Sequence, residues 1–460
     1  MKRVIILGAG ISGLSLGWFL KRRFGPRLSL RILEKSTRSG GWIRTKHHEG
    51  FLFEQGPRSC RSSGTGIETL KLIEQLGMQE SVISADPSSC YRYLWTNKKL
   101  RRLPSGPFSF LFSSLTKGVI PACFRDLFTA RSSIQDESIY SFIKRRFSRR
   151  VAEQLIDPLA AGIYAGNIKQ LSIRSCFPLL YEWEKRQGSV LKGMIKCRKK
   201  PTHALSDFIR QIQKAGIFSM KDGLEELTNE LGTRLDRHII YASEVKKIHC
   251  TQNLASVELE NGTIFEADHI YSTLPGGALS ALFKNSHQEL VRLLSEIPAT
   301  SVATVNLGYH RKFLTKKGFG YLIPSGEKEK ILGTVWDSSI FPKQNQIPEE
   351  TRLTVMIGGA HINQFSDYSK SAFQDIAIAA MERHLGIQAE PNACLVNVAY
   401  QAIPQYLVGH AFRVSAIENI LSRIFPKLTL HGNSFHGISV NDCIANSKRI
   451  EESIRTDELY

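Results

Sequence analysis

The chain has 460 residues, which is too long for one small core and indicates two or three packed modules. Hydrophobic residues make up 42% and charged residues 22%, which is typical of a soluble globular protein, and no stretch reaches the roughly 18 apolar residues that span a bilayer. The formal net charge of +19 favours anionic partners, namely nucleic acid, anionic lipid or a carboxylate-rich small molecule. A basic surface that serves solubility alone is the alternative.

The eight cysteines contain no Cys-x-x-Cys pair. The sequence therefore predicts neither a metal ribbon nor a thioredoxin-like site, and we expect no bound metal. Cysteines scattered through a chain of this length are typical of reduced thiols in a cytosolic protein. Met1-Lys2-Arg3 runs directly into an apolar stretch, with no targeting leader before it. These features predict a cytoplasmic location.

The N-terminal segment predicts a β-α-β unit. Residues 4–7 and 28–33 are apolar runs typical of buried parallel strands, and a glycine-rich stretch with a helix lies between them. Gly8 permits a tight turn, Gly10 lets the backbone approach a pyrophosphate, and Gly13 lets the helix pack close to the sheet. The helix N-terminus then offers unpaired N–H groups to the phosphates of a dinucleotide.

Glu34 ends the second strand, 21 residues after Gly13 (34 − 13). A carboxylate there can accept hydrogen bonds from both ribose hydroxyls and would repel a 2′-phosphate, so NADP is disfavoured. Strand, glycines, helix, second strand and acidic residue arrive in the expected order, which makes the fingerprint specific.

A second glycine stretch narrows the cofactor to FAD. Gly40-Gly41-Trp42 resembles the stretch that follows the fingerprint in the flavoprotein group of amine oxidases and phytoene desaturases. In that group the segment continues along the same cofactor. Residues 51–58, ending in Glu54-Gln55-Gly56-Pro57-Arg58, resemble the strand and turn near the flavin of that group.

The next segments predict a helix over residues 67–76 that ends at Gly77, and a hairpin over residues 91–103. Residues 104–128 are rich in aromatic side chains and are flanked by basic residues. This stretch predicts either contact with a membrane interface, where the cations meet anionic head groups, or a cap over an apolar substrate pocket.

Two basic clusters, at residues 144–150 and 196–200, lack an aromatic recognition motif. We interpret them as solvated helix faces and expect no nucleic-acid partner. Further along, Leu224, Leu227 and Leu231 share one face of a helix with Gly232 beyond it, and residues 245–250 and 255–259 predict paired strands before an Asn-Gly turn. Near the end, we expect a glycine turn and a final helix capped by Asn441-Asp442.

The return of alternating β and α patterns predicts a domain that is discontinuous in sequence. The overall class is α/β, or α+β for the whole chain. We expect a Rossmann-like FAD-binding domain (1–85, 215–285 and 400–460), a mixed-sheet substrate-binding domain (86–100 and 286–399) and a helical, membrane-associating segment (101–214).

Four distant stretches resemble the FAD-dependent protoporphyrinogen oxidase family, which includes coproporphyrinogen oxidases. They are residues 156–166, containing Gly-Ile-Tyr-Ala-Gly; residues 177–190; residues 403–410, Ile-Pro-Gln-Tyr-Leu-Val-Gly-His; and residues 432–444. The resemblance implies non-covalent FAD, a porphyrinogen substrate oxidised by six electrons, and O2 or another acceptor that reoxidises the flavin. It also implies peripheral membrane contact, and it leaves a homodimer open.

The resemblance also assigns site residues in this chain. It implies a substrate-side position for Arg58 and a propionate-binding role for Arg101. No side-chain base is demanded, and His436 is interpreted as structural. The FAD contacts it implies are Gly8, Ala9, Gly10, Ile11, Ser12, Gly13, Glu34, Lys35, Gly41, Trp42, Gly56, Pro57, Arg58, Ser59, Val245, Ile438, Ser439 and Val440.

Two departures and several alternatives remain. Ser439 stands where the family usually has glycine or alanine, and the last helix has Asn446 or Ser447 where glycine is frequent. Protoporphyrinogen IX is the preferred substrate, with coproporphyrinogen III as the alternative. An amine oxidase or carotenoid desaturase and a non-catalytic FAD-binding redox module also stay open. Cys443 is interpreted as a buried thiol rather than a covalent flavin link.

Overall fold

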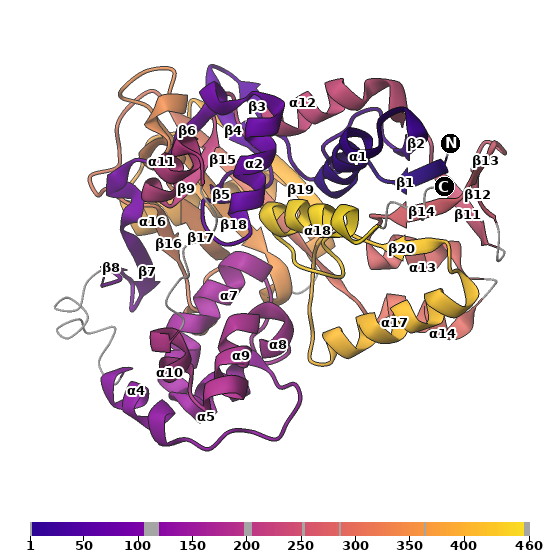
Figure 1. Ribbon diagram of the computed structural model, residues 1–460. Coiled ribbons are helices and arrows are strands. Elements are labelled where there is room, and N and C mark those ends of the chain that lie inside the picture. Colours follow the sequence, from indigo (N-terminus) through magenta and orange to yellow (C-terminus); the bar gives the residue numbers. More distant parts are fainter. Residues whose placement is uncertain are drawn as a thin grey trace.

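The computed structural model describes residues 2–104, 119–196, 205–250, 254–284, 287–362 and 365–454 (Figure 1). Residues 105–118 of the aromatic-rich stretch and residues 197–200 of the second basic cluster lie outside these ranges. The fold is mixed α/β with several sheets, as the sequence predicts. Within the described ranges, no helix is both long enough and apolar enough to cross a bilayer.

A five-stranded parallel sheet contains the predicted β-α-β unit. Its strands in spatial order are β10 (Ile239–Ile240), β2 (Leu28–Leu33), β1 (Lys2–Leu7), β14 (His269–Ser272) and β20 (Leu428–Leu430). Because side chains alternate along a strand, β1 supplies Val4 and Ile6 to the core on one face, and Ile5 and Leu7 to the core on the other. Strands from both ends of the chain therefore share this sheet.

Helices cover both faces of this sheet. One face carries α1 (Ile11–Phe24), α2 (Gly66–Leu76), α11 (Asp207–Ala215), α12 (Glu225–Leu235) and α18 (Val440–Ser453). The other face carries α13 (Gly276–Leu282), α14 (Gln288–Ser295), α17 (His410–Ile424) and the antiparallel sheet of β11 (Val245–Cys250), β12 (Ala255–Leu259) and β13 (Ile264–Ala267). As predicted, α2 ends at Gly77, whose left-handed φ of 74° closes the helix.

Two small sheets lie beside these helices. The hairpin of β3 (Thr45–His48) and β4 (Phe51–Glu54) follows the second glycine stretch, and β9 (Ile217–Met220) pairs with both β5 (Cys60–Arg61) and β6 (Val82–Ser84).

A seven-stranded sheet forms the second large layer. Its strands in spatial order are β19 (Ala393–Pro404), β15 (Ala299–Tyr309), β18 (Thr351–Gly358), β17 (Ile331–Val335), β16 (Gly320–Leu322), β7 (Arg92–Thr96) and β8 (Lys99–Arg102). The predicted hairpin over residues 91–103 is confirmed as β7 and β8. Helices α15 (Asp337–Ile340) and α16 (Lys370–Leu385) join its strands, and α16 packs on one face.

A helical segment packs below the seven-stranded sheet in Figure 1. It contains α4 (Val119–Phe128), α5 (Ile139–Arg146), α6 (Arg149–Val151), a π-helical turn (Ala152–Ile156), α7 (Asp157–Tyr164), α8 (Ile173–Cys176), α9 (Pro178–Gln187) and α10 (Val190–Lys196). Arg146 is fully buried and bonds Asp126 of α4 and Glu184 of α9. This buried charge network fixes α4 against the rest of the segment.

Two details differ from the sequence-based expectations. Gly232 lies inside α12, which continues to Leu235. Its missing side chain leaves space for Ser39 Oγ, which lies 2.8 Å from where a Cβ would stand. The last helix is capped by Ser439 rather than Asn441-Asp442, and Asp442 completes a capping box with Ser439.

The predicted boundaries also cut across secondary structure. Strand β19 continues past residue 399 to Pro404, and β8 continues past residue 100 to Arg102. Helix α11 falls within the predicted helical segment, but its Ile209 and Ile212 pack in the core of the five-stranded sheet. Hydrogen-bond pairing and core contacts determine where these strands end and where α11 packs, and a linear pattern shows neither.

Candidate functional site

The first glycine turn lies where β1 meets α1. Gly8 has a φ of +96°, and a Cβ on Gly13 would lie 1.9 Å from Gly8 O, so any side chain at Gly13 would collide with backbone. Gly10 is the N-cap of α1 without a side-chain cap, and the first turn of α1, with Ile11 and Ser12, has no acidic residue. This helix end can therefore receive an anion.

Glu34 lies beside this turn. Its Oε2 accepts the Ala9 N–H at 2.8 Å, and its Oε1 accepts the Ser36 N–H at 2.9 Å. The backbone N–H of Ser243 donates to Glu34 O at 2.8 Å, and this brings the start of β11, with Val245, close to the end of β2. The carboxylate is thus held at the strand end, where it can accept hydrogen bonds from a ribose, and Lys35 follows it as an exposed residue.

The second glycine stretch contacts the first directly. The Gly40 N–H donates to Ala9 O at 2.8 Å, and a Cβ on Gly41 would lie 3.1 Å from Gly10 Cα. A Cβ on Gly56 would lie 2.0 Å from Trp42 O, so the segment around Gly56 also packs directly against the backbone of its neighbour. Trp42 itself is 45% exposed. Glycine-containing segments from three parts of the sequence therefore meet beside the start of α1.

The turn at residues 56–59 rests on the seven-stranded sheet. Asn306 Nδ2 donates to Glu54 O at 3.0 Å, and Gln55 O accepts from Thr304 Oγ1 at 3.2 Å and Asn397 Nδ2 at 3.0 Å. Polar side chains of the sheet thus hold the backbone that leads into Gly56, Pro57, Arg58 and Ser59.

The last glycine turn reaches the same place from the C-terminal side. Asn441 Nδ2 donates to Arg61 O at 3.0 Å, which brings the start of α18 next to β5. Tyr406 Oη donates to Asn433 O at 2.5 Å and accepts the Gly437 N–H at 2.8 Å. Ile438 and Ser439 lead from this turn into the first residue of α18, Val440, close to the 56–61 segment.

These observations test whether the residues fit FAD. A glycine-lined helix N-terminus suits a pyrophosphate, a carboxylate at a strand end suits a ribose, and glycines let the backbone segments around both lie close together. The chain presents all three features at one junction, so the residues fit the cofactor. Gly8 to Gly13 and Glu34 would hold the adenosine and pyrophosphate portion. Residues 56–59 lie beside the seven-stranded sheet, and residues 438–440 lie close to β5.

One in-register row of residues crosses the seven-stranded sheet from this junction. Residues paired across strands point to the same face. The row consists of Asn397, Thr304, Met356, Gly333, Leu322, Leu94 and Arg101. It starts with two polar side chains beside the turn of residues 56–59, which we call the cofactor turn. It continues as an apolar stretch and ends with the half-buried cation Arg101. Helix α7 packs on this face, where Gly162 meets Leu322.

Other candidate residues have structural surroundings. His436 is exposed and pairs with Glu418 at 3.0 Å, which agrees with the structural interpretation. Cys443 is buried, and burial raises the pKa of its thiol to about 11, so it is a neutral thiol at physiological pH.

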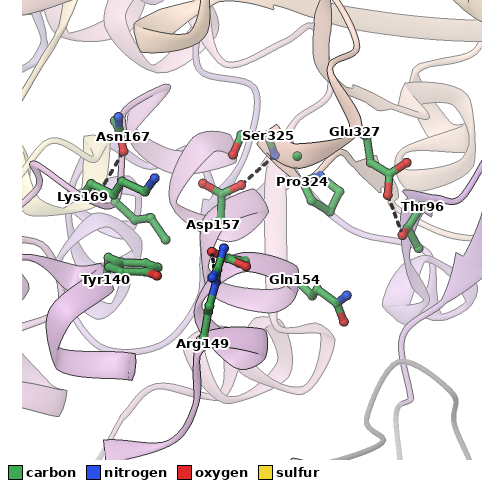
Figure 2. A pocket seen from close by; sticks show the side chains of 13 residues that line it. Thr96, Tyr140, Arg149, Gln154, Asp157, Asn167, Lys169, Pro324, Ser325 and Glu327 are labelled. Carbon is green, nitrogen blue, oxygen red and sulfur yellow. Dashed lines mark hydrogen bonds and ion pairs between the residues drawn. The ribbon is translucent and has the colours of Figure 1, made fainter. Parts of the chain in front are cut away.

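A separate cavity of about 450 Å³ lies between the helical segment and the loop after β16 (Figure 2). Asp157 at its centre accepts the Ser325 N–H at 2.7 Å, and Arg149, Glu327 and Lys169 supply charges of both signs. None of the residues that line it belongs to the glycine stretches. It is therefore distinct from the cofactor junction.

Sequence reasoning missed three residues of this site. Asp337 pairs with Arg58, Glu54 is buried behind the turn, and Tyr406 holds the last glycine turn. The Ile-Pro-Gln-Tyr stretch did single out Tyr406 as a family feature, but not its contacts. Asp337 carried no sequence signal, because its partner lies 279 residues away.

Comparison with known proteins identifies the class. The model of the family described as flavin containing amine oxidoreductase matches residues 11–450, so the chain belongs to this family and is an FAD-dependent oxidase. A solved structure of a protein from Exiguobacterium sp. 255-15 has the same fold, with a TM-score of 0.82, 23% identity and 98% of each chain covered.

The relatives narrow the resemblance further. The protoporphyrinogen oxidase of Bos taurus is 36% identical over 97% of both chains. The coproporphyrinogen III oxidase of Bacillus subtilis is 29% identical, over 97% of this chain and 96% of its own length. The likeness to protoporphyrinogen and coproporphyrinogen oxidases that the sequence motifs indicate is thereby confirmed.

Proposed function

We propose that this protein oxidises protoporphyrinogen IX to protoporphyrin IX in haem biosynthesis. The observation that carries the proposal is the 36% identity to a protoporphyrinogen oxidase along nearly the whole of both chains. The likeness covers the glycine stretches and also the distant segments around α7 and the end of β19.

Bound FAD would supply the hydride acceptor for this oxidation. The chain's own residues bind and orient. The N–H groups at the start of α1 hold phosphate, and Glu34 holds ribose. The turn at residues 56–59, fixed by Asn306 and Thr304, presents Arg58 near the start of the in-register row. We call the face of the seven-stranded sheet that carries this row the substrate face. No side-chain base is assigned, in keeping with the buried or paired state of His436 and Cys443.

The in-register row of the seven-stranded sheet supports a porphyrinogen as the substrate. A porphyrinogen is apolar at its centre and carries carboxylates at its edge. Met356, Leu322 and Leu94 form the apolar middle of this row, and Arg101 stands at its far end, about 24 Å or five strand spacings from Thr304. Arg101 is proposed to pair with a propionate, since guanidinium and carboxylate match in geometry.

The test compares protoporphyrinogen IX and coproporphyrinogen III as substrates of the flavin-loaded protein, followed by porphyrin fluorescence. We expect turnover of protoporphyrinogen, and Arg101→Ala should raise its KM about 10-fold or more through loss of a charged hydrogen bond. Arg102→Ala is the matched control, because Arg102 stacks on Tyr91 from the neighbouring row. Amine turnover without porphyrinogen turnover would overturn the proposal, and FAD binding without any turnover would favour the redox module.

Coproporphyrinogen III is the second candidate substrate. Relatives named coproporphyrinogen III oxidase in Bacillus subtilis and Staphylococcus aureus are 29% and 28% identical to the chain. The net charge of +19 suits a substrate with four propionates. Faster oxidation of coproporphyrinogen in the same experiment would select this activity.

The proposal includes a cytoplasmic, peripheral attachment to a membrane through α4. Phe124 and Phe128 on this helix are 60% and 87% exposed, and Arg125 lies between them. The cysteines of the described ranges are all free, which supports a reducing compartment. We also propose that O2 or another acceptor reoxidises the flavin and that the protein forms a homodimer. The proposed division into three domains is supported by the separate five- and seven-stranded sheets.

A further inference from the structure

An ion pair joins the cofactor turn to the seven-stranded sheet. Arg58 Nη1 donates to Asp337 Oδ1 at 2.8 Å, and the two side chains are only 11% and 12% exposed. Asp337 is the first residue of α15, just after β17. A charged pair this far from solvent is weakly screened, so each partner strongly restrains the other.

Asp337 is itself held from behind. Thr354 Oγ1 donates to Asp337 Oδ2 at 2.7 Å, and Asn306 Nδ2 lies 3.4 Å from Thr354 Oγ1 and 3.0 Å from Glu54 O. A chain of hydrogen bonds therefore links Glu54 O to Arg58 through Asn306 of β15, Thr354 of β18 and Asp337. The backbone of Arg58 is fixed as well, since Ser219 Oγ donates to its carbonyl at 2.7 Å.

The same geometry leaves part of the guanidinium available. Within the residues that the structure describes, Arg58 Nε and Nη2 have no hydrogen-bond partner, whereas Nη1 is engaged by Asp337. Arginine presents its donors in a rigid, planar fork, so fixing one nitrogen fixes the direction of the others. The carboxylate also offsets the charge, so Arg58 offers directed hydrogen bonds more than a free positive charge.

We infer that Asp337 is a positioning residue that fixes the Arg58 guanidinium at the junction of the cofactor turn and the substrate face. This role rests on the proposed function for its substrate, but it concerns a residue that neither the sequence motifs nor the family likeness singles out. Asp337 acts through Arg58 and is not itself a catalytic residue.

The test is a double-mutant cycle on the flavin-loaded protein with Arg58→Ala, Asp337→Ala and the double variant. Two quantities are measured: the rate of anaerobic flavin reduction by the porphyrinogen, and the visible absorption spectrum of the bound FAD. We expect each single variant to slow reduction about 10-fold or more, and the double variant to be no slower than the slower single variant. Both single variants should change the spectrum in the same way.

Asp337→Asn serves where Asp337→Ala fails to fold, because asparagine keeps the size and the acceptor while removing the charge. We expect Asp337→Asn to reduce the flavin faster than Asp337→Ala but more slowly than wild type. Its thermal midpoint should stay near that of wild type. Glu182→Gln, which removes an exposed ion pair in α9, is the matched control and should leave both readouts unchanged.

Two results would overturn the inference. In one, Asp337→Ala matches wild type in spectrum and in reduction rate. In the other, the losses of the two single variants multiply in the double variant, which would show independent roles. Failure of the proposed function would look different: wild type would oxidise neither porphyrinogen, while the spectral comparison of the variants would still decide the role of Asp337.

Discussion

Glu54 is a buried carboxyl group, and its surroundings change its pKa. Its Oε1 accepts the Leu224 N–H at the start of α12, at 2.6 Å, and its Oε2 accepts from Thr45 Oγ1 at 2.9 Å. Burial raises its pKa to about 8, against an ordinary value of 4.5, because the interior disfavours the charged form. The side chain thus connects the cofactor turn to α12 as a carboxyl that tends to stay protonated.

We expect Glu54→Gln to flatten the pH dependence of stability. Between about pH 4.5 and 8 the folded protein keeps a proton on Glu54 that the unfolded chain releases, so the free energy of unfolding falls as pH rises, by up to about 1.4 kcal/mol per pH unit. Glutamine has the same shape and no such proton. Urea denaturation from about pH 5 to 9 should show the variant gaining stability over wild type as pH rises.

Glu153→Gln is the matched control, since Glu153 is exposed in an i,i+4 pair with Arg149. Its pH profile should follow wild type closely. A Glu54→Gln profile parallel to that of wild type would show that Glu54 is ionised in the folded protein at neutral pH.

Helix α4 shows how a buried network determines what an element exposes. Asp126 accepts from Ser189 Oγ at 2.6 Å and from the Leu191 N–H at 2.9 Å, and it also bonds the buried Arg146. These contacts hold the inner side of α4 against α10. Phe124 and Phe128 consequently lie on the outer side, where their rings contact solvent. The fixed helix presents apolar area beside basic residues, as interfacial helices do.

We expect the Phe124→Ser/Phe128→Ser variant to bind vesicles containing anionic phosphatidylglycerol about 10-fold or more weakly than wild type. Each buried phenylalanine contributes about 1.5–3 kcal/mol on transfer from water. Vesicle co-sedimentation measures the change. Ile264→Ser is the control, because Ile264 is 62% exposed on β13, away from the helical segment. Equal loss in both variants, or none in either, would contradict a specific membrane contact by α4.

At the scale of the whole molecule, the Ile-Pro-Gln-Tyr stretch is where three parts of the chain meet. It ends β19 of the seven-stranded sheet, and Tyr406 O accepts the Ser172 N–H of the helical segment at 2.8 Å. Tyr406 Oη then bonds the glycine turn before α18. Gln405 Nε2 adds a hydrogen bond to Tyr164 O at the end of α7, at 2.8 Å.

We expect Tyr406→Phe to lower the free energy of unfolding by about 1–3 kcal/mol, because the Gly437 N–H and Asn433 O lose a buried partner. FAD should also dissociate faster, since the turn leading to α18 is less restrained. Thermal unfolding and flavin release measure the two effects. Tyr400→Phe is the control, because Tyr400 is exposed and lies on β19, six residues before Tyr406. Equal thermal stability and equal FAD release in the two variants would show that the hydrogen bonds of Tyr406 Oη do not stabilise the turn before α18.

Local sequence alone determined the cofactor end of this protein. Gly8, Gly13 and Glu34 act within one contiguous β-α-β unit, so spacing and residue type suffice to predict both structure and ligand. The hairpin of β7 and β8 and the ends of β2 and α2 were predictable for the same reason, since their signals are local. The motifs around α7 and Tyr406 indicated the family, but only by resemblance.

Only the tertiary structure decided which distant residues meet. Asp337 and Arg58 are 279 positions apart, and Arg101 aligns with Thr304 only through the order and register of six strands. The sheet to which β8 and β19 belong and the core that α11 joins likewise follow from strand pairing and packing. The physical reason is the same in each case: a turn or helix start is encoded by neighbours in sequence, whereas an ion pair or a sheet row is encoded by neighbours in space.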